Sequence, residues 1–255
     1  ELDKQPMYLC NRGRAYGSLG QYDKMIEYCG RAVELRRETL TDAFGLDYYY
    51  EFLAEAYFRD NRLPEFEKLF EKSDDLKEEE KKKAIIYNRI GNLLVQGGQV
   101  IESIPYYEKA ISLDDKWPIY ECNLGLTYGK LIKPDWDKMI EHCQRAVELR
   151  RDTPTDPYGL VYYYDFLAEA YFRAGKLKKF EDEFEKFGDI KNEPKKEARI
   201  YNRIGNLLAK GQKEQEAIIY YEKAIELDSE SPIYECNLGL TYGKLPKPDL
   251  DKMIE

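Results

Sequence analysis

The chain has 255 residues, of which 43% are apolar, 35% charged and 14% aromatic, so it can bury a core and is neither disordered nor fibrous. Its 40 basic and 49 acidic residues give a net charge of -9, which opposes the attraction to phosphate on which nucleic-acid binding depends. No stretch approaches the roughly 18 apolar residues of a membrane span. Neither nucleic acid nor a membrane is therefore an expected partner.

The cysteine content points to a reducing environment. The five cysteines form an odd set without any CxxC spacing, so neither a disulfide framework nor a zinc site is indicated. The sequence also lacks an Asn-x-Ser/Thr acceptor. We therefore expect a cytoplasmic protein without metal or cofactor, whose cysteines are Cys10, Cys29, Cys122, Cys143 and Cys236.

Repeated segments follow one another along the chain. A weaker first copy begins at Met7 (MYLCNRGRAYGSLG), and three later segments each return after 114 positions. These are YYYEFLAEAYFR at 48–59 and its near-copy at 162–173, IYNRIGNLL at 86–94 and 200–208, and IYECNLGLTYGKL at 119–131 and 233–245. A long period of this kind indicates a repeat architecture.

Shorter units divide the long period. Within each unit, apolar and small residues recur at helical spacing, with a small residue at position 8 and large ones at positions 4, 11 and 24. Small residues let two helices approach closely, and large ones fill the space between them. The units start near Pro6, Asp47, Ala84, Pro118, Val161, Ala198 and Pro232.

This pattern resembles the tetratricopeptide repeat, a helix-turn-helix unit of 34 residues, and it is cleanest in Ala198–Ser231. Two longer connections, at 38–46 and 152–160, resemble those of kinesin light chains. The resemblance implies an all-α, right-handed superhelical solenoid, a single array over residues 1–255 with an incomplete last unit.

Neither end of the sequence falls at a repeat boundary, which suggests a window cut from a longer array. A solenoid unit buries its apolar face on its neighbour, so an interrupted array exposes apolar residues such as Leu238 and Tyr242 at one end and Leu9 and Tyr16 at the other. We therefore expect head-to-tail self-association through the cut ends.

Catalytic signatures are weak. His142 is the only histidine, and its neighbour Cys143 would point about 100° away from it on a helix. Cys143 and Cys29 both occupy position 24, where the repeat places a core residue. We expect these residues to pack in the core, and we expect a protein that is not an enzyme.

The remaining polar pattern lies at positions that line the concave groove of this family. Two units carry acidic pairs followed by an arginine, and the units after them carry asparagine pairs beside an arginine. The predicted groove residues are Glu51, Glu55, Arg59, Asn88, Arg89, Asn92, Asn123, Asp165, Glu169, Arg173, Asn202, Arg203 and Asn206.

These residue types suit an extended peptide. An asparagine amide donates and accepts together, as clamping a peptide backbone requires, and the acidic pairs favour a partner with basic residues. Asn88 stands where the family's chaperone-tail clamp has lysine, so that ligand is not expected. The predicted function is a peptide-binding scaffold. The alternatives are a structural or self-assembling array, the regulatory region of a larger enzyme, or polar residues that are only solvated or bond neighbouring units.

Overall fold

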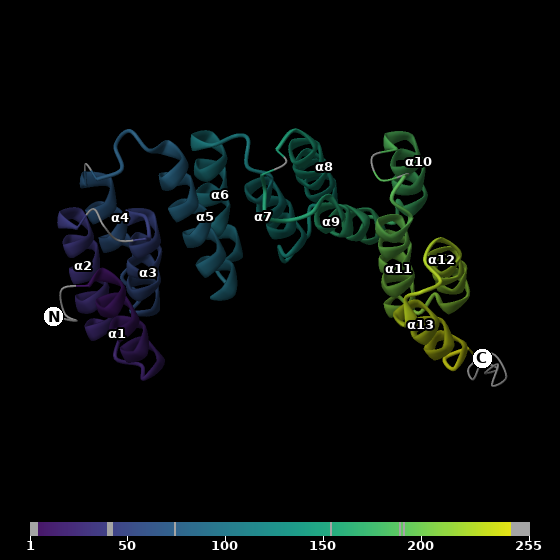
Figure 1. Ribbon diagram of the computed structural model, residues 1–255, viewed down its shortest axis with the longest axis horizontal. Coiled ribbons are helices and arrows are strands. Elements are labelled where there is room, and N and C mark those ends of the chain that lie inside the picture. The colour runs from purple at the N-terminus through teal and green to yellow at the C-terminus, as the bar shows by residue number, and fades with distance from the viewer. Residues whose placement is uncertain are drawn as a thin grey trace. The chain divides into compact units, whose positions relative to one another are not determined.

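The computed structural model describes residues 5–39, 43–73, 75–153, 155–188, 190 and 192–245. Within these residues the chain forms thirteen α-helices joined by short connections and contains no strand (Figure 1). The prediction of an all-α helical-repeat solenoid is confirmed.

The helices alternate between first and second members of successive pairs. The first helices are α1 (Pro6–Ser18), α3 (Leu46–Arg59), α5 (Glu80–Gln96), α7 (Pro118–Gly129), α9 (Leu160–Arg173), α11 (Pro194–Lys210) and α13 (Pro232–Tyr242). The second helices are α2 (Tyr22–Glu38), α4 (Leu63–Lys72), α6 (Val100–Leu113), α8 (Trp136–Asp152), α10 (Leu177–Phe187) and α12 (Glu214–Leu227).

Local sequence signals define many helix ends. Proline occupies the first turn of α1, α4, α11 and α13, where a missing N–H costs nothing and the fixed φ angle suits the helix. Helices α5 and α11 begin at Glu80 and Pro194, one turn before the repeat frame starts at Ala84 and Ala198. Polar residues fill that extra turn, so the apolar pattern did not reveal it.

The chain divides into two compact units, residues 1–127 and 128–255. In the first, α1 contacts α3 and α3 contacts α5, and each of these first helices also packs on its own second helix. In the second, α9 contacts α11 and α11 contacts α13 in the same way. Each unit therefore brings side chains of consecutive first helices onto a shared face.

In two helix pairs, α5–α6 and α11–α12, a small residue faces a large ring in the core. Gly91 on α5 lies against the ring of Tyr107 on α6, and Gly205 on α11 lies against the ring of Tyr221 on α12. Both tyrosines are buried, as are the repeat-position cysteines Cys29 and Cys143. The predicted packing of small against large residues, and the core location of both cysteines, are confirmed.

Aromatic clusters replace the small-residue packing in two pairs. Phe66 of α4 is fully buried and lies 5.6 Å from Phe70 and 6.4 Å from Tyr50, measured between ring centroids. In α10, Phe180 and Phe184 lie 5.6 Å apart in the same arrangement. Phe66 and Phe180, which stand where the Ala198–Ser231 repeat has the small residue Ala217, are thus accommodated by packing against other rings.

Candidate functional site

The first compact unit contains a polar cleft of about 640 Å³ between α1, α3 and α5. Four of the predicted groove residues line it together: Glu51, Glu55 and Arg59 from α3, and Arg89 from α5. Helix α1 contributes further polar side chains, and Tyr48 and Phe52 provide aromatic surface. The cleft therefore combines side chains of both charges with aromatic rings.

Glu55 already forms ion pairs with two arginines of the protein. One carboxylate oxygen accepts a 2.9 Å hydrogen bond from Nε of Arg59, and the other accepts a 2.6 Å bond from Arg89. Its side chain is only 12% exposed, so both ion pairs are partly shielded from water. Through Arg89, Glu55 links α5 to α3, and it therefore offers little negative charge to a ligand.

Glu51 is the acidic residue that remains unneutralised in this cleft. Burial raises its pKa to about 7, an effect that the charge of Arg89 opposes and that of Asp47 reinforces. No ion pair at contact distance is found for it among the described residues. Glu51 therefore changes charge near neutral pH, where a cationic ligand would favour its ionised form.

The predicted asparagines of this unit are partly used within the fold. Asn88 accepts a 2.8 Å hydrogen bond from the amide of Asn123, and Asn92 accepts a 2.9 Å bond from the hydroxyl of Tyr107. These bonds match the interpretation in which amides link neighbouring helices. They consume carbonyl oxygens only, so the amide N–H donors of Asn88 and Asn92 are left for other acceptors.

The second compact unit has a cleft of about 370 Å³ between α9, α11 and α13. It brings together four predicted residues, Asp165, Asn202, Arg203 and Asn206. Burial raises the pKa of Asp165 to about 6, against the lowering influence of Arg203 and Arg199. Its Oδ1 and the Nε of Arg203 are buried without a hydrogen-bond partner among the described residues.

The pairings of the first unit recur in the second. Glu169 accepts a 2.8 Å bond from Nε of Arg173 and a 2.7 Å bond from Arg203. Asn202 accepts from Asn237 at 2.8 Å, and Asn206 accepts from the hydroxyl of Tyr221 at 3.0 Å. Glu169 and Arg173 do not line the cleft that contains Asp165.

Two charged cleft residues were not predicted from the sequence. Arg14 lines the first cleft, with its guanidinium 4.6 Å from the ring centroid of Phe52, and Arg199 lines the second. They occupy positions 9 and 2 of their repeats, both inward positions. Reading those positions in every unit, rather than only in the recurring acidic and amide pairs, would have found them.

The described part of the chain has no residues arranged as a metal site, as a Cys-His catalytic pair or as a membrane span. No group of three or more His, Cys, Asp or Glu side chains there could hold a metal ion. His142 stacks on Tyr128, with ring centroids 5.4 Å apart, while Cys143 is buried. None of the helices in the same residues is both long and apolar enough to cross a bilayer.

The solved structures that match this chain have low sequence identity to it. The APC/C hetero-tetramer Cut9-Hcn1 matches at 17% identity over all of this chain and 45% of that chain, with a TM-score of 0.45. MamA matches at 18% over 87% and 97% of the two chains (TM-score 0.45). YrrB, a TPR protein with an unusual peptide-binding site, matches at 18% over 70% and 88% (TM-score 0.40). The chain thus spans less than half of the first of these proteins.

A protein-family model matches part of the sequence. The family model described as tetratricopeptide repeat matches three segments, residues 8–39, 84–116 and 198–231. In the structure these segments are the helix pairs α1–α2, α5–α6 and α11–α12. Such repeats generally build scaffolds for protein interactions rather than enzymes. These three segments of the chain are tetratricopeptide repeats.

Proposed function

We propose that this protein is a non-enzymatic scaffold that binds an extended, basic segment of a partner protein along the inner face of its first helices. The observation that carries the proposal is the pair of clefts, each lined by predicted residues from consecutive first helices. Each contains one carboxylate, Glu51 or Asp165, that has no ion pair among the residues that the structure describes. A lysine or arginine of the partner would supply the missing charge.

The amides give the same face a way to hold a peptide backbone. The carbonyl oxygens of Asn92 and Asn206 are occupied by tyrosine hydroxyls, which fixes each amide in orientation. Their N–H groups would then donate to the carbonyl oxygens of an extended chain. An internal bond of this kind prepares the donor rather than removing it, because it lowers the conformational freedom lost on binding.

A peptide selection followed by neutralisation of the two carboxylates tests the proposal. Peptides selected from a displayed random library should be enriched in lysine and arginine. The double variant Glu51→Gln, Asp165→Asn should bind these peptides with at least tenfold lower affinity. The matched control is Glu102→Gln combined with Glu108→Gln, two exposed positions on α6. Equal binding by both double variants would overturn the assignment of these carboxylates.

The same peptide should bind more tightly as pH rises from about 6 to about 8. A cation favours ionised Glu51, whose pKa is about 7, so binding releases a proton wherever the free protein holds one. Fluorescence polarisation across this range should show the rise in the wild type and a flatter curve in Glu51→Gln. A parallel pH dependence in both proteins would exclude Glu51 as the contact.

Changing Asn206 to aspartate separates the clamp from the fold. The substitution keeps an oxygen that accepts from Tyr221 but removes the N–H donors. If the amide holds the peptide backbone, affinity should fall although the cleft becomes more acidic. Stronger binding of the basic peptide would show that charge, not backbone clamping, governs this position.

A further inference from the structure

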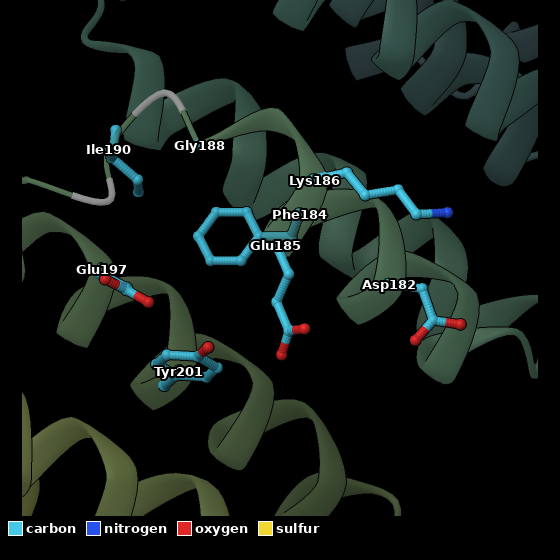
Figure 2. Close-up of a pocket in the computed structure, with 8 residues that line it drawn as sticks. All are labelled: Asp182, Phe184, Glu185, Lys186, Gly188, Ile190, Glu197 and Tyr201. Atoms are coloured by element: carbon cyan, nitrogen blue, oxygen red, sulfur yellow. The ribbon is translucent and has the colours of Figure 1, made fainter.

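A separate cleft of about 560 Å³ lies between α10 and α11 in the second compact unit. Phe184, Ile190 and Tyr201 form its apolar floor, and all three are at least nine-tenths buried. Figure 2 shows Glu185 extending from α10 toward Tyr201, Glu197 near Tyr201 on α11, and Lys186 pointing away from the Phe184 ring. None of the predicted groove residues lines this cleft.

The equivalent place in the first unit already holds a cation. Tyr87 and Glu71 precede Tyr201 and Glu185 by 114 positions. The ammonium of Lys109 lies 4.2 Å from the ring centroid of Tyr87 and 3.0 Å from Glu71. In the first copy, the tyrosine ring and the glutamate of this repeat therefore hold a cation together.

In the second unit the corresponding lysine has another partner. Lys223 lies 3.7 Å from Glu181 and 5.1 and 5.2 Å from the ring centroids of Tyr201 and Tyr220. Glu185 is left without an ion pair at contact distance among the described residues. The Tyr201 ring therefore keeps the lysine of the repeat, whereas Glu185, unlike Glu71, has no lysine at contact distance among the described residues.

The net charge of the residues around the site also differs between the two copies, and it is more negative in the second. The cleft carries Asp182, Glu185 and Glu197 against Lys186, a net charge of -2. The equivalent residues of the first unit are Lys68, Glu71, Lys83 and Lys72, a net charge of +2. The carboxylates of Glu197, Glu185 and Glu181 also help burial raise the pKa of Tyr201 to about 12.

We propose that the cleft between α10 and α11 is a second docking site, which takes an arginine side chain from an extended segment of a partner protein. The aliphatic part of that side chain would lie on Phe184, Ile190 and Tyr201, while the planar guanidinium donates to Glu185 and Glu197 at once. This site does not depend on the inner-face function proposed above, because it shares no residue with those clefts.

Nuclear magnetic resonance titration tests the site directly. The probe is acetyl-Gly-Gly-Arg-Gly-Gly-amide, and its control is the same peptide with citrulline, a neutral analogue of arginine. The arginine peptide should shift the signals of Gly188 and Tyr201 in a saturable manner, with at least tenfold higher affinity than the citrulline peptide. Equal shifts with both peptides would overturn the proposal.

Variants of the cleft complete the test. Glu185→Gln combined with Glu197→Gln should reduce the affinity for the arginine peptide at least tenfold, and Asp182→Lys, which introduces the residue found at position 68, should also weaken it. Glu102→Gln with Glu108→Gln should have no effect. Circular dichroism verifies helicity in each variant. Unchanged affinity in the folded Glu185, Glu197 variant would refute the site.

Discussion

Two turn positions adopt a left-handed backbone with different residues in the two copies. Asn61 has φ 57° where its counterpart Gly175 has φ 69°, and Gly98 has φ 81° where Gln212 has φ 59°. Glycine is therefore not what imposes this geometry. The next residue closes each turn with a backbone hydrogen bond, such as the 3.0 Å bond from Lys213 N–H to the carbonyl of Leu208.

Gln212 should therefore destabilise the folded state, because its backbone has a left-handed conformation. A side chain in the left-handed region costs roughly 1–2 kcal/mol, and glycine avoids this while losing about 0.5–1 kcal/mol of chain entropy. We expect Gln212→Gly to increase the free energy of unfolding by about 0.5–1 kcal/mol, measured by urea denaturation. The reverse change, Gly98→Gln, should lower it by a similar amount, and a destabilised Gln212→Gly protein would contradict this account.

At the scale of a helix pair, Gly91 and Gly205 determine how closely α5 packs on α6 and α11 packs on α12. A Cβ at Gly205 would stand 2.6 Å from Cε1 of Tyr221, and one at Gly91 would stand 2.7 Å from Cε1 of Tyr107. Each ring is buried, and its hydroxyl is fixed to an asparagine. The ring therefore has little freedom to move aside.

Replacing either glycine by alanine should overpack the pair. We expect Gly205→Ala and Gly91→Ala each to lower the free energy of unfolding by about 1–3 kcal/mol. Gly159→Ala is the matched control, because a Cβ there would meet nothing within 4 Å and φ is -73°. Thermal denaturation distinguishes these cases, and a loss in Gly159→Ala equal to that in Gly205→Ala would refute the steric explanation.

The sequence predicted helix pairing well because small residues and rings recur at fixed positions within each repeat. It predicted the site residues less completely. The pattern shows Glu55 and Arg89 as separate groove residues, but only the packing of α5 on α3 reveals that they pair at 2.6 Å. Likewise, the choice of Lys223 between Glu181 and Glu185 depends on side-chain distances that spacing does not encode.

Across the whole molecule, the expected self-association depends on apolar residues near the ends of the described chain. Leu9 and Tyr242 are buried, whereas Leu19 is 70% exposed, and Ile233 and Leu240 on α13 are 52% and 59% exposed. The predicted last helix pair continues into residues 246–255, which lie outside the described residues. Contacts between molecules would therefore use Leu19 and α13 rather than Leu9 and Tyr242.

Light scattering should show an average mass that rises with protein concentration. Ile233→Ser combined with Leu240→Ser should suppress the rise, because it removes exposed apolar area from α13. Ile132→Ser is the control, since Ile132 is 96% exposed but lies away from both ends. A wild-type mass that stays constant with concentration would count against head-to-tail assembly.

The boundary between the two compact units also separates the two tryptophans, one in each unit. The chain has only two, and Trp117 packs against the core of the first compact unit while Trp136 opens α8 in the second. Intrinsic fluorescence can therefore follow each unit separately when the other tryptophan is replaced by phenylalanine. Coincident melting curves would mean that the repeats unfold as one cooperative block, and separate curves would mean that the array breaks at its middle.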